Sequence, residues 1–120
     1  MVLLVEDEPM LRELGLTVLE ELGYRVLTAE NGREALRLLA ENPGVSIDLL
    51  LTDVVMPEMG GKELVDRLRP LSPQTKVIFC SGYTEDAIFL SGGLEAGVFF
   101  LQKPYTVAAV ARKVRDVLAA

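Results

Sequence analysis

The sequence alternates between short apolar runs and segments with helical spacing, and no other feature constrains its fold as strongly. Five apolar runs have the length and composition of buried strands: Val2–Val5, Arg25–Ala29, Leu49–Thr52, Lys76–Cys80 and Val98–Leu101. A segment with helical features follows each run. Strands and helices that alternate in this way predict an α/β fold, with right-handed crossovers and a parallel sheet covered by helices on both faces.

The helical segments are predicted from the spacing of apolar residues and from signals at their ends. Asn31, with Glu34 three residues later, predicts a capped start of the second helix, and the last helix is expected to begin near Thr106. Gly23 and Pro43-Gly44 are stop signals. The fourth segment, around Thr84–Leu90, is only weakly patterned. The apolar faces of the others are expected at Met10, Leu11, Leu14, Val18, Leu19 and Leu22, then Ala35, Leu36 and Leu39, then Leu64, Val65 and Leu68, and finally Val107, Val110, Val114, Val117 and Leu118.

The length and hydropathy of the chain predict one globular domain over residues 1–120. Apolar residues make up 50% of the chain and charged residues 25%, which is enough to build a core and is not typical of disorder. The apolar runs are far too short to span a bilayer, and Asp7 and Glu8 interrupt the start before a signal peptide could form. A cytoplasmic location without membrane contact is therefore expected. The oligomeric state is open between a monomer and a weak dimer.

Charge and composition exclude several classes of function. The net charge of −6 opposes direct binding to the phosphates of nucleic acids. The chain contains no histidine, so it has no histidine base, metal ligand or phosphohistidine of its own. Cys80 is the single cysteine, which excludes an internal disulfide, and its apolar surroundings predict a small core residue.

Polar residues with useful chemistry follow four of the five predicted strands. They are Glu6 and Asp7 after the first strand, Asp53 after the third, Ser81 after the fourth and Lys103 after the fifth. In parallel sheets ligands bind beyond the carboxyl ends of the strands, so these groups are expected at one edge. Carboxylates packed together repel one another, and Mg²⁺ is the natural cation for a site of oxygen ligands. A carboxylate can also attack phosphorus, with the metal, a lysine and a hydroxyl stabilising the transferred group.

Each of these residues also has a simpler structural interpretation. Glu6 and Asp7 could cap the first helix, because Pro9 occupies an early helical position. Asp53 and Ser81 could be turn residues, and Lys103 a solvated charge. Taken singly, the structural interpretation is favoured for each residue. Taken together, the functional one is favoured, because no structural need puts all five at one end of a sheet.

The sequence around these residues resembles the receiver domain of two-component response regulators. The segment Asp53–Gly61 is similar to the phosphorylation-site segment of that family, with Met-Pro and the final Gly in register. Leu4–Glu8 resembles its acidic pair, Ser81-Gly82 its hydroxyl switch position and Lys103-Pro104 its lysine. The resemblance covers almost the whole chain without an insertion. It implies a flavodoxin-like, doubly wound (βα)5 fold with a five-stranded parallel sheet in the order 2-1-3-4-5.

The resemblance also implies a role for each site residue. Asp53 would accept a phosphoryl group from a phosphohistidine on a histidine kinase or on a histidine phosphotransfer domain. Asp7, Asp53 and the backbone carbonyl of Val55 would bind Mg²⁺ directly, and Glu6 would act mostly through a bound water.

The remaining implied roles concern the phosphoryl group and the conformational switch. Ser81 and Lys103 would contact the phosphoryl oxygens. Phe100 matches the aromatic switch position, where the family often has tyrosine. Phosphorylation would shift the population toward a conformation in which Phe100 fills the space that Ser81 vacates, changing the face made by the fourth helix, fifth strand and fifth helix.

Several alternatives remain at this stage. The region after Ser81 resembles receiver modules at the C-terminus of hybrid sensor kinases, with a stand-alone regulator as the close competitor. By itself the chain is not expected to be a stand-alone enzyme, although it could be a module of a hybrid histidine kinase.

A haloacid-dehalogenase-type phosphatase would carry a second acidic residue at position 55, where this chain has Val55. A flavin binder would need a phosphate loop where this chain has Glu6, Asp7 and Glu8. A receiver-like interaction module that is never phosphorylated ranks low, because all five site groups are present.

Overall fold

A five-stranded parallel sheet forms the centre of the computed structural model, which describes residues 1–54, 59–81, 98–102 and 106–119. The strands are β1 (Val2–Val5), β2 (Val26–Ala29), β3 (Leu49–Asp53), β4 (Lys76–Ser81) and β5 (Val98–Gln102). Their order in the sheet is β2-β1-β3-β4-β5, and every neighbouring pair is parallel. The predicted α/β fold and strand order are both confirmed, and each predicted strand agrees with the observed one within one residue at either end.

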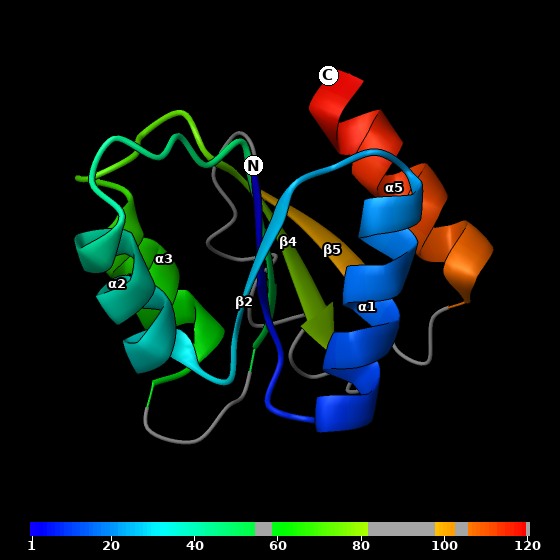
Figure 1. Cartoon of the computed structure of the whole chain (residues 1–120), viewed down its shortest axis with the longest axis horizontal. Coiled ribbons are helices and arrows are strands. Elements are labelled where there is room, and N and C mark those ends of the chain that lie inside the picture. The colour runs from blue at the N-terminus through cyan, green and yellow to red at the C-terminus, as the bar shows by residue number, and fades with distance from the viewer. Residues whose placement is uncertain (55–58, 82–97, 103–105, 120) are drawn as a thin grey trace.

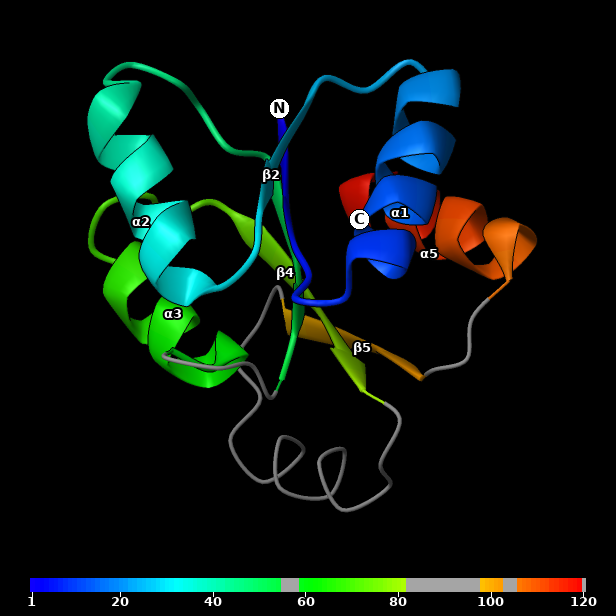
Figure 2. The ribbon, with the colours of Figure 1, turned by 60° about the horizontal axis from the view of Figure 1, so that its bottom comes forward.

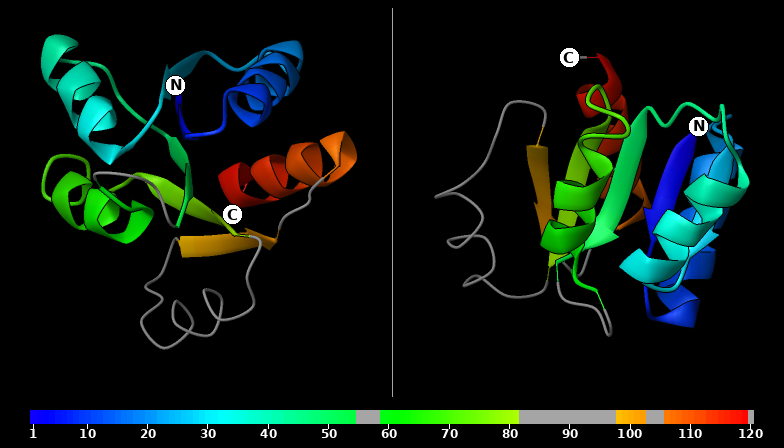
Figure 3. Two further views of the ribbon diagram at one scale, coloured as in Figure 1. Left: turned by 90° about the horizontal axis from the view of Figure 1, so that it is seen from below. Right: turned by 90° about the vertical axis from the view of Figure 1, so that its left-hand side faces the viewer.

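Helices cover both faces of the sheet. The described helices are α1 (Pro9–Glu21), α2 (Gly32–Glu41), α3 (Gly61–Leu68) and α5 (Val107–Ala119). Figure 1 shows α2 and α3 together on one side of the sheet and α1 and α5 on the other, and the left view of Figure 3 shows the three layers end-on. The predicted fourth helix lies outside the described residues. None of the described helices combines the length and apolar character that crossing a bilayer requires.

The core is divided by the sheet into two apolar clusters. Because side chains alternate along a strand, neighbouring residues of β3 reach opposite faces. Leu50 packs in the cluster under α2 and α3, and Leu51 packs in the cluster under α1 and α5. Both are almost completely buried, which explains why Leu49–Leu51 of β3 form a continuous apolar run instead of alternating with polar residues.

The apolar stripe predicted for α1 is partly wrong. Met10, Leu14 and Leu22 are exposed, with 79%, 40% and 47% of their surface accessible, whereas Gly15, Val18 and Leu19 are buried. A side chain at Gly15 would lie 3.0 Å from a methyl carbon of Leu4, so the glycine marks where the helix comes closest to the sheet. A pattern read from apolar residues alone does not count a glycine as part of the buried stripe.

One position of the last helix also differs from the prediction. Val107 is the first residue of α5 and is 51% exposed, while Val110, Val114 and Val117 are buried. Thr106 begins the helix as expected, since its hydroxyl accepts a hydrogen bond from the Ala109 amide at 3.1 Å. The helix therefore rests on the sheet from its second turn onward.

The start of α2 agrees with the predicted cap. The side-chain oxygen of Asn31 accepts a hydrogen bond from the Glu34 amide at 2.9 Å. The Glu34 carboxylate reaches back and accepts one from the Glu30 amide at 3.2 Å. These two bonds fix the first turn of α2 next to the carboxyl end of the sheet.

Candidate functional site

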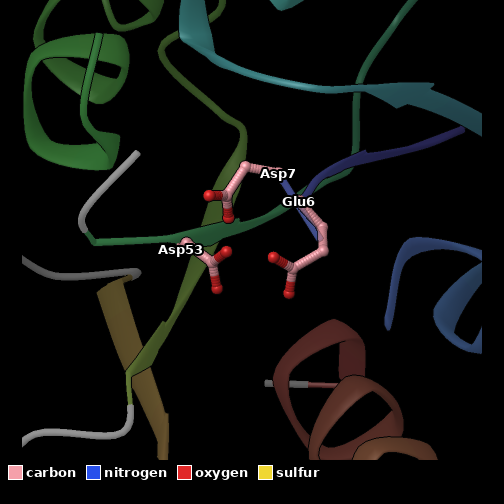
Figure 4. A group of neighbouring side chains, drawn as sticks. All are labelled: Glu6, Asp7 and Asp53. Atoms are coloured by element: carbon pink, nitrogen blue, oxygen red, sulfur yellow. The ribbon is translucent and has the colours of Figure 1, made fainter. Parts of the chain in front are cut away.

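The carboxyl ends of β1 and β3 lie side by side at one edge of the sheet. The register pairs Val5 of β1 with Thr52 of β3, so Glu6 and Asp53 come directly after neighbouring positions. Figure 2 turns this edge toward the viewer, and Figure 4 shows Glu6 and Asp7 at the end of β1 facing Asp53 at the end of β3. The structure thus brings together the three carboxylates that were predicted at this edge of the sheet.

The geometry of these carboxylates fits a small, hard cation. Glu6, Asp7 and Asp53 each present a carboxylate oxygen within 4.8 Å of the other two. Mg²⁺ holds oxygen ligands at about 2.1 Å, so two of its ligands lie at most about 4.2 Å apart, and small side-chain rotations would meet that limit. Glu6 and Asp53 are buried, at 2% and 5% exposure, whereas Asp7 is exposed. The site therefore has a buried floor and an open side, as suits an ion that keeps several waters.

The loop that carries Glu6 and Asp7 is held by hydrogen bonds to β2, to α1 and within the loop itself. The Glu6 amide donates to the Ala29 carbonyl of β2 at 3.0 Å, and the Glu6 carbonyl accepts from the Arg12 guanidinium at 2.8 Å. The Glu6 carboxylate accepts from the Glu8 amide at 3.2 Å. These contacts fix the backbone on both sides of the carboxylate pair.

The helix cap in this loop is Glu8, and neither Glu6 nor Asp7 takes that role. The Glu8 carboxylate accepts a hydrogen bond from the Met10 amide at 3.4 Å, and Pro9 is the first residue of α1. A carboxylate next to a proline at the first helical position was visible in the sequence as a signal for this cap. The structural interpretation of Glu6 and Asp7 as caps is therefore wrong.

Asp53 is held between β4 and the start of α3. The next amide, that of Val54, donates to the Cys80 carbonyl at 3.2 Å, and the Val54 carbonyl accepts from the Gly61 amide at 2.9 Å. A Cβ atom at Gly61 would overlap the Asp53 carbonyl oxygen, so only glycine allows α3 to start this close to β3. Cys80 itself is buried, as predicted.

The other predicted site residues are described only in part. Val55 and Lys103 lie outside the described residues. Ser81 is the last residue of β4, paired in register with Gln102. Phe100 lies on β5 opposite Phe79, is half-buried, and packs against the cluster under α2 and α3.

Comparison with known proteins gives a family for almost the whole chain. The family model described as "response regulator receiver domain" matches residues 2–115. Over 117 residues the chain is 43% identical to the sensor kinase CckA of Brucella abortus, which covers 98% of this chain but only 12% of that kinase. It is 34% identical over 119 residues to the response regulator receiver protein CpdR of the same strain, covering 99% of this chain and 97% of that protein.

Solved structures agree with this assignment. The receiver domain from the hybrid histidine kinase CckA superposes with a TM-score of 0.82 at 38% identity, covering 98% of this chain and 97% of that one. A response regulator receiver protein from Sinorhizobium medicae superposes with a TM-score of 0.86 at 25% identity, covering 99% and 94%. With a matching fold, an acidic cluster at the expected sheet edge and a family match over residues 2–115, the chain belongs to the receiver domains of two-component signalling systems.

Proposed function

We propose that Asp53 is the phosphoryl acceptor of this receiver domain and that Glu6, Asp7 and Asp53 hold a Mg²⁺ ion beside it. The observation that carries the proposal is the convergence of these three carboxylates within 4.8 Å at the carboxyl edge of the sheet. Asp53 is nearly buried but borders the exposed Asp7, so its carboxylate lies at the base of an open site. The family resemblance adds the carbonyl of Val55 as a further ligand, and it assigns Glu6 a contact through water.

The chemistry assigned to Asp53 is nucleophilic attack on phosphorus. One carboxylate oxygen forms a new P–O bond, while the bond from phosphorus to the donor breaks and the donor keeps its electron pair. With a phosphohistidine donor, the leaving group is an imidazole nitrogen. The product is an acyl phosphate on Asp53.

The residues around Asp53 have two tasks in this reaction. The backbone contacts of Val54 and Gly61 hold the end of β3, so that the carboxylate is oriented before the donor arrives. Bound Mg²⁺ would offset the negative charge of the carboxylates and of the incoming phosphoryl oxygens. From the resemblance, Lys103 and Ser81 are the further groups that contact these oxygens.

The partner we propose is a histidine kinase or a histidine phosphotransfer domain. The relatives show two arrangements, since the chain matches a small part of the sensor kinase CckA but nearly all of CpdR. As part of a longer kinase, the chain would receive the phosphoryl group from a phosphohistidine of the same protein. As a separate receiver protein, it would receive the group from a phosphohistidine on a partner. We further propose that phosphorylation shifts the face formed by the fourth helix, β5 and α5, with Phe100 as the aromatic switch residue.

Acetyl phosphate and intact-protein mass spectrometry test the acceptor. Incubation with acetyl phosphate and Mg²⁺ is expected to add one phosphoryl group to the wild-type chain. Chelating the metal before the incubation should prevent most of the adduct from forming. Asp53→Asn should give none, because an amide oxygen is a poor nucleophile and forms no acyl phosphate.

Asp48→Asn is a matched control for this experiment. Asp48 is an exposed aspartate one residue before β3, at the opposite end of the same strand from Asp53, where it pairs with the N-terminal amine at 2.7 Å. This variant should form the adduct as the wild type does. An adduct that persists in Asp53→Asn, or a wild-type chain that stays unmodified, would refute the proposed acceptor.

A further inference from the structure

The segment Met59–Gly61 lies between the start of α2 and the end of β3 and touches both. On the α2 side, the Gly32 amide donates a hydrogen bond to the Met59 carbonyl at 3.4 Å. On the β3 side, the Gly61 amide donates to the Val54 carbonyl at 2.9 Å. This three-residue segment therefore links a helix that carries no site carboxylate to the strand end that carries Asp53.

The contact between Gly32 and Met59 leaves no room for a side chain. A Cβ atom at Gly32 would lie 2.9 Å from both Cγ and Sδ of Met59 and 3.1 Å from its Cβ. Met59 is only 8% exposed and belongs to the cluster under α2 and α3, so it has neighbours on its other sides. Any larger residue at position 32 must therefore displace the Met59 side chain.

The contact on the β3 side is equally close. A Cβ atom at Gly60 would lie 3.0 Å from the Val54 carbonyl oxygen, and one at Gly61 would lie 3.1 Å from the Phe79 ring and overlap the Asp53 carbonyl. The segment Met59–Gly61 thus packs closely against the start of α2 on one side and against the end of β3 on the other. These close contacts give a displacement of Met59 a route to the end of β3 that carries Asp53.

We propose that Gly32 is a positioning residue for the carboxylate site and acts on Asp53 through Met59. The contacts of Gly32 that carry the proposal are with Met59, so its effect on the carboxylates is indirect. The inference rests on the proposed function in so far as the effect is measured as Mg²⁺ affinity and phosphoryl acceptance. It goes beyond that function because it makes the start of α2 part of the machinery that sets the site.

Gly32→Ala is the direct test. Alanine favours the helix more than glycine does, so the variant should keep α2 and its cap. We expect roughly tenfold weaker Mg²⁺ binding, the size of effect seen when residues that support metal ligands are changed. Isothermal titration gives the affinity, and the rate of adduct formation with acetyl phosphate should fall with it.

A second substitution distinguishes positioning from general damage. Met59→Ala removes the two atoms that a Cβ at position 32 would strike, so Gly32→Ala/Met59→Ala should bind Mg²⁺ more tightly than Gly32→Ala alone. Gly44→Ala is the control, because Gly44 lies beyond the other end of α2 with a positive φ of 90° and open space around it. That variant should lose stability through backbone strain but keep the wild-type Mg²⁺ affinity.

The backbone of metal-free protein gives a readout that does not depend on the proposed function. Gly32→Ala should shift the amide resonances of Val54 and Gly61, and the same substitution made in a Met59→Ala background should shift them far less. A wild-type chain that binds no Mg²⁺ would refute the proposed function, while these resonances would still decide the link from Gly32 to Asp53. Unchanged resonances, or an affinity in Gly32→Ala equal to that in Gly44→Ala, would overturn the inference.

Discussion

Asp7 is the exposed member of the carboxylate cluster, and it can be changed without opening the core. Without metal, its charge repels the nearby carboxylates of Glu6 and Asp53, so Asp7→Asn should raise the melting temperature of the metal-free protein. With metal, the wild type should gain about 2.7 kcal/mol of stability when free Mg²⁺ is a hundred times its Kd. Asp7→Asn should lose most of that gain. Thermal unfolding with and without Mg²⁺ measures both effects.

Glu13→Gln is the control for this prediction, because Glu13 is an exposed acidic residue on α1 outside the cluster. It removes the same charge but should leave the gain in stability with Mg²⁺ unchanged. If Asp7→Asn lowered the melting temperature of the metal-free protein, repulsion within the cluster would not be the dominant effect. If it kept the full gain with Mg²⁺, Asp7 would not be a ligand.

At the residue scale, sequence reasoning found the carboxylates of the candidate site but missed the groups that hold them in place. Glu6, Asp7 and Asp53 were predicted because strand ends in a parallel sheet meet at one edge. The hydrogen bond from Arg12 to the Glu6 carbonyl and the contact of Gly32 with Met59 were not predicted. They depend on how a helix is seated on the sheet to within an ångström, and residue spacing does not carry that information.

At the scale of elements, β5 and α5 are the described parts of the face that is proposed to respond to phosphorylation. Phe100 on β5 is half-buried, and the Lys113 ammonium of α5 lies 5.7 Å from the centre of the Phe99 ring. The contact of Lys113 with Phe99 ties β5 to α5, while Phe100 packs on the other face of the sheet, so a rearrangement of β5 should reach the helix through Phe99. Beryllofluoride with Mg²⁺, a stable mimic of the phosphorylated state, should therefore shift backbone NMR resonances along both elements.

The same titration has an internal control in α2. The C-terminal part of this helix, around Leu39, lies beside Ile47 and Ser72 at the opposite edge of the sheet from the carboxylates, and it should keep its resonances. Asp53→Asn should abolish the response of β5 and α5 to beryllofluoride. Resonances that stay unchanged along β5 and α5 in the wild type would contradict the switch.

The helices show where sequence patterns are sufficient and where they are not. The cap at Asn31 and the start at Thr106 were predicted, because capping depends on local hydrogen bonds between residues three apart. The buried stripe of α1 was predicted with errors at Met10 and Leu14. Those residues are apolar yet face outward, and Gly15 determines which side of the helix approaches the sheet.

For the whole molecule, the parallel sheet with helices on both faces followed from alternation alone, and the strand order came with the family resemblance. The alternation predicts two apolar clusters because buried strands need partners on each face. It does not say how strongly the two clusters depend on one another. The structure makes this question specific, since one strand, β3, supplies central residues to both.

Leu50 and Leu51 allow that dependence to be measured. They are adjacent on β3, with 0% and 2% exposure, and they face the α2/α3 cluster and the α1/α5 cluster respectively. Each change to alanine should cost about 2–5 kcal/mol of unfolding free energy, from lost burial and the cavity left behind. Because both clusters share β3, each variant should still unfold in one cooperative transition, with amide protection in all four described helices falling together. Urea titration followed by circular dichroism, together with hydrogen exchange, measures this, and Leu71→Ala is the control because Leu71 is 72% exposed. Two separate transitions, or full protection of α1 and α5 in Leu50→Ala, would mean that the two layers fold independently.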